Sequence, residues 1–464
     1  MKAAYSTRAK RLVQLVAGLG SSIAPFLVAS MVVAAPTIGV EFEAEVSLLG
    51  WLTAAFFLVA AALLVPMGRI ADIRGSRRVF TAGMIVYLVS AVVCIFSPDI
   101  FTLIAGRALT GAGAAMVFGT SIALLSLVFP PDERGKAIGL NVTAMFGGFT
   151  IGLLAGGFVT FYITWRALFV VAGVLAAVVL LLVLSQVKGE CELARTKDYD
   201  PPGMVLYSSG LLFAFYGLSE FSTSLGPYAL VAGSMVLGAF YVWERRYPNP
   251  LIARRVARSR EFLLAAGTNI LFQAGAFAIP FLLSLHFQFV AELDARVAGF
   301  LLIIPQSLMT LTSPVSGRLT VRHSNYLVTG AGSVLNALGV GLLLTLSEGT
   351  SIIVLVLALA LVGIGTGLFM PAVVNWALGG VAREDYGVAS AFTETARLTG
   401  MTFSNVVIIV VFGLLLGAAP VSASQIPEFI EAARASALLY VIFSATSAAI
   451  SFLMLRGRGI RALV

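Results

Sequence analysis

Long apolar runs alternate with short polar segments along the whole chain. A helix needs about 20 apolar residues to cross a bilayer. Fourteen runs approach or exceed that length, at 13–38, 47–67, 79–97, 100–129, 138–161, 164–186, 203–221, 226–244, 262–289, 297–316, 325–346, 351–379, 387–416 and 432–455. Each run is continuous, whereas strands of a membrane β-barrel alternate apolar and polar residues. The pattern predicts an all-α integral membrane protein with fourteen transmembrane helices.

The composition agrees with this pattern. Of the 464 residues, 59% are hydrophobic and 11% are charged, whereas average usage in soluble domains is about 25% charged. The mean hydropathy is +0.99. A soluble fold would have too little polar surface, so we expect one membrane-embedded bundle rather than several soluble domains.

Basic residues concentrate in alternate loops. With the N-terminus in the cytoplasm, most of the 30 Lys and Arg residues lie in cytoplasmic segments. This is the positive-inside distribution, and it predicts that both termini are cytoplasmic, in a plasma (inner) membrane. The formal net charge of +8 therefore reflects topology and does not indicate binding to nucleic acid.

Three pairs of similar segments share nearly one offset, which indicates an internal repeat. The pairs are Gly111 with Gly363 (363 − 111 = 252), Gly68 with Gly317 (317 − 68 = 249) and Ala137 with Gly387 (387 − 137 = 250). The offset predicts two parallel six-helix halves, at 1–186 and 261–464, with two extra central transmembrane helices and a basic linker at 187–260. Parallel halves around a central site are the plan of many secondary transporters.

Several classes of chemistry lack their sequence signature. The chain has no G-x-x-x-x-G-K-[ST] motif for ATP hydrolysis. His286 and His323 are far apart and have no metal-ligand cluster around them, and no Ser, His and Asp arrangement suggests catalysis. Cys94 and Cys191 lie in different surroundings, so a disulfide framework is not expected. The sequence predicts no enzyme, no cofactor and no metal.

The most specific motif is GRIADIRGSRRVF, which begins at Gly68. It is similar to the loop between helices 2 and 3 of major facilitator superfamily transporters. RALTGAGAA, GGFTIGLLAGG, WRALF and AGFLLIIPQSL resemble segments of the superfamily's fourteen-helix drug:proton antiporter branch. The resemblance covers nearly the whole chain. It implies a bundle that carries small molecules across the lipid bilayer, with protons as the coupling ion.

Five residues of the loop motif match the family pattern: Gly68, Asp72, Gly75, Arg77 and Arg78. The resemblance implies a cytoplasmic gate, in which the acid and the basic residues form a latch across the halves. An acid can also interact favourably with the positive end of a neighbouring helix. The alternative is a solvated basic turn that serves only the topology.

A stripe of glycines marks the fifth run. Gly148, Gly152 and Gly156 are four residues apart and share one helix face, and Gly157 follows. Small residues let membrane helices approach closely. The resemblance implies that this packing limits leak in an antiporter, although Leu153 replaces the proline usual there. Ordinary helix packing is the alternative.

Three charged residues lie well inside predicted helices: Arg107, Glu394 and Arg397. Ionisable residues in membrane helices are candidates for function by default. Glu394 and Arg397 are three positions apart, so their side chains can meet on one face. The alternatives are that Glu394 only neutralises Arg397 and that Arg107 only bonds backbone carbonyls.

The first helix departs from the family pattern. The branch usually has an acid nine residues before a proline, but Leu27 stands nine residues before Pro36. This leaves Glu394 as the candidate for proton coupling, with Glu220, near the end of its helix, as a weaker rival.

The sequence therefore predicts a monomeric, proton-coupled exporter of hydrophobic or amphipathic small molecules, working by alternating access. Further candidates for the polar lining of its cavity are Asn141, Asn269, Gln273 and Asn375. One alternative is a uniporter or importer of a neutral or anionic metabolite, with Arg107 and Arg397 binding the anion. Another is a membrane sensor that transports nothing.

Overall fold

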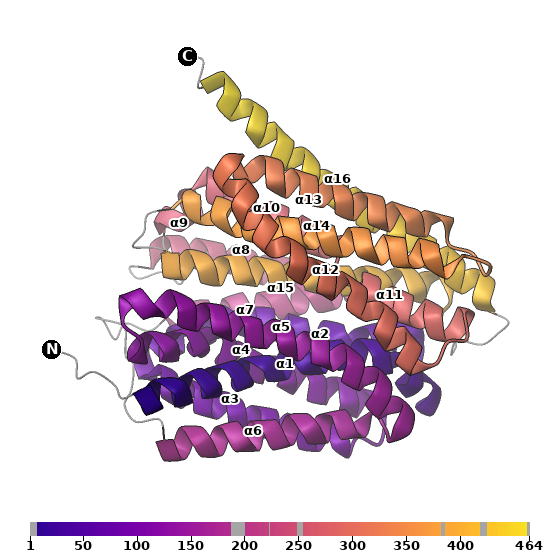
Figure 1. The fold of residues 1–464 in the computed structure, drawn as a ribbon, viewed down its shortest axis with the longest axis horizontal. Coiled ribbons are helices and arrows are strands. Elements are labelled where there is room, and N and C mark those ends of the chain that lie inside the picture. Colours follow the sequence, from indigo (N-terminus) through magenta and orange to yellow (C-terminus); the bar gives the residue numbers. More distant parts are fainter. Residues whose placement is uncertain are drawn as a thin grey trace. The chain divides into compact units, whose positions relative to one another are not determined.

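The computed structural model describes residues 7–186, 200–221, 223–247, 254–381, 386–417 and 425–461. Figure 1 shows the helices in chain order. They are α1 (Thr7–Glu41), α2 (Val46–Arg74), α3 (Ser76–Ile95), α4 (Ile100–Val128), α5 (Pro131–Tyr162), α6 (Arg166–Gln186), α7 (Pro201–Ser219), α8 (Gly226–Arg246), α9 (Arg254–Arg258), α10 (Arg260–Ala274), α11 (Ile279–Leu285), the π-helical turn η1 (His286–Val290), α12 (Ala295–Arg322), α13 (Asn325–Gly341), the 3₁₀ turn η2 (Leu342–Thr345), α14 (Ile352–Gly379), α15 (Tyr386–Leu415) and α16 (Ile426–Arg461). Much of the predicted linker, at 187–199 and 248–253, lies outside the described residues.

Each of the fourteen predicted runs coincides with helix in the structure. Among the described residues, 13 helical segments are long and apolar enough to cross a membrane. The remaining run corresponds to α7, which has 19 residues. The predicted all-helical membrane fold is therefore confirmed.

The predicted run at 262–289 is not a single continuous helix. The span Arg260–Val290 is interrupted between α10 and α11, and its last turn is the π-helical η1. At the interruption, the Ala278 N–H donates to the Ser404 hydroxyl (2.9 Å), and the Gly275 carbonyl accepts from the Asn336 amide (3.2 Å). In lipid, backbone polar groups must find partners inside the protein. Side chains from α13 and α15 therefore make the interruption possible, and apolar periodicity alone could not reveal it.

The contacts divide the chain into two compact units, and each is described by itself. Unit 1 comprises Met1–Ile38, Ala55–Leu212 and Gly233–Leu251, and unit 2 comprises Gly39–Ala54, Phe213–Ala232 and Ile252–Val464. In unit 1, α3 packs on α4 and α6; in unit 2, α13 packs on α14 and α16. The boundaries that the sequence suggests at 186 and 260 stay predictions.

The two units repeat the same close backbone contact. In unit 1, a Cβ added to Gly111 on α4 would strike the carbonyl oxygen of Phe56 on α2. In unit 2, a Cβ added to Gly363 on α14 would strike the carbonyl oxygen of Pro305 on α12. The partners are offset by 305 − 56 = 249 residues, close to the 252 that separates the glycines.

A second contact repeats in the same way. A Cβ on Gly83 would lie 3.2 Å from the Gly113 carbonyl oxygen, and a Cβ on Gly332 would lie 2.7 Å from the Gly365 carbonyl oxygen. Equivalent helices thus approach each other through equivalent glycines, as small-residue packing in membranes requires. The predicted internal repeat is confirmed by these contacts.

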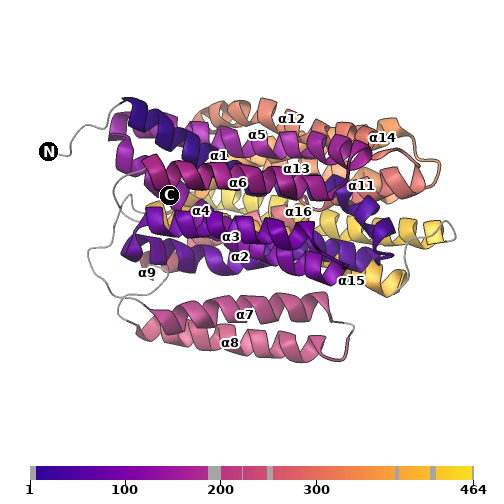
Figure 2. The same ribbon diagram turned by 90° about the horizontal axis from the view of Figure 1, so that it is seen from below.

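The two extra helices form a hairpin, and Figure 2 shows α7 and α8 side by side. Within unit 1, the Tyr207 and Phe240 rings lie 5.5 Å apart, and Asp200 accepts a hydrogen bond from the Trp243 indole (3.0 Å). Helix α7 also contacts α2, because the Ser208 hydroxyl donates to the Ala62 carbonyl (2.8 Å). The Ser208–Ala62 hydrogen bond therefore joins the hairpin to α2.

Candidate functional site

The loop motif folds as a one-residue connection. Helix α2 ends at Arg74, α3 begins at Ser76, and Gly75 between them has φ 98° and ψ 129°. Side chains with a Cβ rarely adopt a positive φ of this kind, whereas glycine does so at little cost. Gly75 is thus required by the turn itself. Gly68 has a different role, because its backbone lies against Gly119 of α4.

The charged residues of the motif flank this turn. Asp72 is half-buried near the end of α2 and interacts electrostatically with Arg69 on the same helix. Arg78 is exposed on α3, and its guanidinium donates to the Arg74 carbonyl (3.3 Å). These contacts describe the turn within unit 1, and the latch across the halves stays a prediction.

The glycine stripe of α5 packs on α1. A Cβ added to Gly148 would lie 2.6 Å from the Ser22 carbonyl oxygen, and one added to Gly156 would lie 2.8 Å from the Ser30 carbonyl oxygen. Gly152 meets the Phe26 carbonyl in the same way, so a four-residue step on α5 faces a four-residue step on α1. Gly157, the last glycine of the segment, is buried. The backbones touch, and any larger side chain on the stripe would separate them.

Polar contacts extend this interface toward the beginning of both helices. Lys10 forms an ion pair with Glu133 (2.6 Å), and the Gln14 amide donates to the Ala137 carbonyl (3.1 Å). Asn141, one turn after Ala137, is 2% exposed, and its Oδ1 has no hydrogen-bond partner. Helical spacing puts Asn141 on the same face of α5 as Ala137 and Gly148.

Arg107 lies in the interior of unit 1. Its side chain is 0% exposed, and its guanidinium carbon is 5.1 Å from the centre of the Phe56 ring. A cation over an aromatic face is attracted by the negative face of the ring. Arg107 also interacts electrostatically with Tyr87 and Cys94 on α3. Arg107 belongs to unit 1, whereas Glu394 and Arg397 belong to unit 2.

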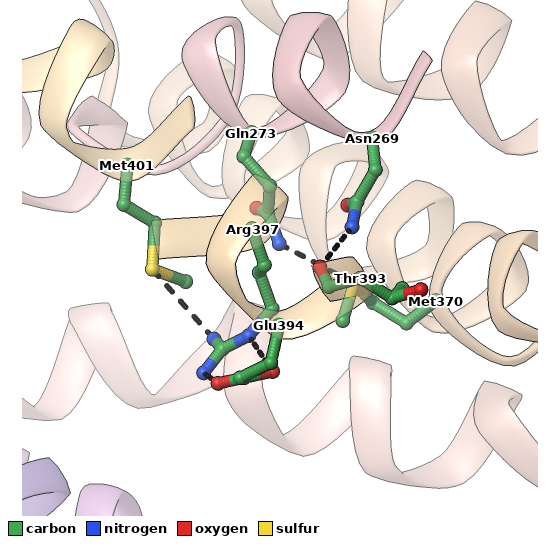
Figure 3. Close-up of polar contacts among 7 residues, drawn as sticks. All are labelled: Asn269, Gln273, Met370, Thr393, Glu394, Arg397 and Met401. Carbon is green, nitrogen blue, oxygen red and sulfur yellow. Dashed lines mark hydrogen bonds and ion pairs between the residues drawn. The ribbon is translucent and has the colours of Figure 1, made fainter. Parts of the chain in front are cut away.

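Glu394 and Arg397 form a bidentate ion pair on α15 (Figure 3). Arg397 Nε donates to one carboxylate oxygen (2.9 Å), and Nη2 contacts the other. Two parallel bonds of this kind are the strongest arrangement for these groups. The exposed fractions of the side chains are 34% for Glu394 and 20% for Arg397. The structure thus gives Glu394 the neutralising contact that the sequence allows, at a position that solvent or a ligand can reach.

Two of the four amide candidates lie beside this pair. On α10, the Asn269 amide donates to the Thr393 carbonyl (3.1 Å), and the Gln273 amide contacts the Met370 thioether (3.3 Å), as Figure 3 shows. Both side chains are less than 5% exposed. Asn141 belongs to unit 1, and Asn375 is an exposed residue of α14.

Gly400 explains how α10 comes so close to α15. A Cβ there would lie 2.5 Å from the Ile270 carbonyl oxygen and 2.7 Å from Gln273 Cβ. This contact is the counterpart in unit 2 of Gly152 against Phe26 in unit 1. Asn269, Gln273, Glu394 and Arg397 are therefore brought together by a helix pair that repeats the α1–α5 pair.

Other buried polar contacts were not predicted. The Thr53 hydroxyl donates to Asn405 Oδ1 (2.6 Å), and the Asn336 amide donates to Gly275 and to Ser444. Asparagine in a long apolar run is the signal that could have drawn attention to Asn336 and Asn405. In the described part of the chain, no group of three or more His, Cys, Asp or Glu residues could hold a metal ion.

The helical repeat can be compared with known families. The family model described as Major Facilitator Superfamily matches residues 12–405. The chain belongs to the Major Facilitator Superfamily.

Two relatives in the superfamily match most of the chain. The multidrug resistance protein Stp of Mycobacterium tuberculosis is 29% identical over 86% of this chain and 75% of its own length. The puromycin resistance protein pur8 of Streptomyces alboniger is 30% identical over 75% of this chain and 71% of its own. Among solved structures, a bacterial homologue of the human lysosomal transporter Spinster has a TM-score of 0.71 and 15% identity, covering 97% of this chain and 98% of its own. That likeness supports the fold alone.

Proposed function

We propose that this protein exports hydrophobic or amphipathic small molecules in exchange for protons, by alternating access. The observation that carries the proposal is the match, over most of the chain, to relatives named as multidrug and puromycin resistance proteins. The proposed energy source is the proton gradient, as the resemblance to the drug:proton antiporter branch implies.

Glu394 is the proposed proton carrier. Among the described residues, Glu394 is the carboxylate that lies away from the ends of the spanning helices. Its rival Glu220 follows the end of α7 and accepts a hydrogen bond from the Trp51 indole (3.1 Å). A proton on Glu394 would remove the negative charge that holds Arg397. The bidentate pair would open, and the freed guanidinium would take other partners. Opening and closing of the pair is the proposed link between protonation and transport.

The remaining sequence predictions complete the proposal. Both termini lie in the cytoplasm, the protein acts as a monomer in the plasma membrane, and the Gly75 turn with Asp72, Arg77 and Arg78 forms the cytoplasmic gate. The basic excess at the predicted cytoplasmic loops supports this orientation.

Transport in proteoliposomes tests the proposal. Purified protein would be reconstituted with an imposed pH gradient, and uptake of a fluorescent amphipathic substrate would be followed with and without an uncoupler. We expect the gradient to drive accumulation, and Glu394→Gln to abolish it because an amide does not titrate. Glu394→Asp should retain part of the activity.

Glu220→Gln is the matched control, because it removes a carboxylate whose partner is the Trp51 indole rather than Arg397. Its transport should stay within about twofold of the unmodified protein. A substrate flux that does not depend on the proton gradient would instead favour a uniporter. Unchanged proton coupling in Glu394→Gln would exclude Glu394 as the proton carrier.

A further inference from the structure

The charge state of the Glu394–Arg397 pair restricts what can bind beside it. Both carboxylate oxygens of Glu394 are engaged by Arg397, and the pair as a whole is neutral. A permanent cation in the membrane interior needs a counter-charge, since burying an unpaired charge is costly. To obtain one here, it would have to break the bidentate pair.

Arg397 has N–H donors that Glu394 does not engage. A guanidinium offers five N–H donors, and Glu394 engages only Nε and Nη2. The remaining nitrogen, Nη1, contacts the Met401 thioether (3.6 Å), as Figure 3 shows. A thioether is a weak acceptor. An oxygen acceptor of a bound molecule would form a stronger, charge-assisted bond to Nη1 without disturbing Glu394.

The neighbouring groups suit an amphipathic molecule. Met370 and Met401 supply two thioethers, which adapt to ligands of different shape. The amide groups of Asn269 and Gln273 donate to Thr393 and Met370. Both side chains are uncharged, so they supply no counter-charge for a bound cation. The partial exposure of both members of the ion pair gives access.

We propose that the site at Arg397 takes uncharged, zwitterionic or anionic amphipathic molecules that present a carbonyl or carboxylate oxygen to Nη1, and that it discriminates against permanent cations. This substrate class rests on the proposed function, which makes the pair part of the transport site. It identifies Arg397 as the direct ligand contact and Met401 as a specificity-determining neighbour.

A matched set of dyes tests this assignment. A rhodamine methyl ester is a permanent cation, its free acid is a zwitterion, and fluorescein is an anion, while all three share one xanthene skeleton. Binding would be measured by fluorescence anisotropy on protein in neutral-lipid nanodiscs. We expect the anion and the zwitterion to bind at least tenfold more tightly than the cation. Equal or tighter binding of the cation would overturn the proposal.

Variants at Met401 locate the contact. Met401→Gln puts an amide oxygen beside Nη1, which should compete with the ligand and weaken fluorescein binding at least threefold. Met401→Leu keeps the volume and adds no acceptor beside Nη1, so it should weaken fluorescein binding less than Met401→Gln does. Arg397→Lys keeps the charge but removes the fork, and should also weaken fluorescein at least threefold. If both Met401→Gln and Arg397→Lys bind fluorescein like the unmodified protein, the assignment is wrong.

Two controls separate this proposal from the proposed function. Arg296→Gln removes one positive charge from the Arg296–Asp294 ion pair (2.8 Å), which lies at the start of α12 rather than on α15. The order of dye affinities should survive that change. The pH-gradient experiment tests proton-coupled export, whereas the order of dye affinities tests the substrate class. Either result can contradict its own proposal while the other proposal stands.

Discussion

Thr53 on α2 donates a hydrogen bond to Asn405 Oδ1 on α15, at a distance of 2.6 Å. Both side chains are about 1% exposed, and the Asn405 amide in turn donates to the Met401 carbonyl (2.8 Å). The contact belongs to unit 2, where the first part of α2 packs on α15 at Gly50 and Ile409. A side-chain bond between two apolar helices fixes their register, because apolar packing alone allows sliding.

Loss of this bond should destabilise the protein. Thr53→Val keeps the shape and removes the donor, leaving Asn405 Oδ1 buried without that partner. Hydrogen bonds between membrane helices contribute about 0.5–2 kcal/mol. We therefore expect the free energy of unfolding to fall by about that amount, which SDS titration would show as a lower unfolding midpoint. Thr53→Ser retains the hydroxyl and is the control. An unchanged midpoint in Thr53→Val would contradict the role given to the bond.

The glycine stripe should not tolerate a methyl group. In Gly148→Ala, the new Cβ would lie 2.6 Å from the Ser22 carbonyl oxygen, so α1 and α5 must move apart. Overpacking of this kind costs about 1–3 kcal/mol. We expect lower thermal stability and lower transport. Gly147→Ala is the matched control on the neighbouring position, because nothing lies within 4 Å of its added Cβ. Equal loss in both variants would argue against a role for close packing.

The loop motif makes a similar contrast between two of its glycines. Gly75→Ala forces a side chain into a backbone with φ 98°, which costs about 1–3 kcal/mol. Gly68→Ala adds a Cβ that meets nothing within 4 Å. Differential scanning fluorimetry should show a lower Tm for Gly75→Ala and a near-normal Tm for Gly68→Ala. If Gly68→Ala nevertheless loses transport, its role lies in movement of the gate rather than in stability.

The sequence was informative where one rule governs many residues. Apolar run length identified the helices, because lipid permits little else to span it. The repeat was visible because both halves need glycine at equivalent close contacts, such as Gly111 on Phe56 and Gly363 on Pro305. The stripe on α5 was also evident from its spacing, although its partner, α1, was not.

Contacts between distant residues could not be predicted in this way. The pairing of Glu394 with Arg397 followed from their spacing, but the positions of Asn269 and Gln273 beside them depend on how α10 packs on α15. Asn141 belongs to unit 1, and its grouping with those amides around one cavity stays a prediction. The interruption after α10 could not be predicted from the local sequence, because the residues that stabilise it, Asn336 and Ser404, lie more than 60 positions away along the chain.

That interruption gives a fourth prediction. The Asn336 amide donates to the Gly275 carbonyl (3.2 Å) and to the Ser444 hydroxyl (2.8 Å), and the side chain is 0% exposed. Asn336→Leu would leave the Gly275 carbonyl without this donor in an apolar interior, at a cost of about 1–3 kcal/mol. We expect a lower Tm, and amide hydrogen exchange should increase at 275–278. Normal exchange there would show that other contacts hold the interruption.

The ion pair on α15 should behave as a coupled unit, which a double-mutant cycle can measure. Arg397→Gln leaves Glu394 without its two donors, and Glu394→Gln leaves Arg397 without its carboxylate, so each single change should destabilise the protein. The double variant exchanges the charged pair for two amides that can bond to each other, and it should be more stable than the sum of the single changes predicts. We expect a coupling energy of about 1–3 kcal/mol, measured as unfolding midpoints in SDS. Additive single effects would mean that the two side chains act independently, and protonation of Glu394 could then not be transmitted through Arg397.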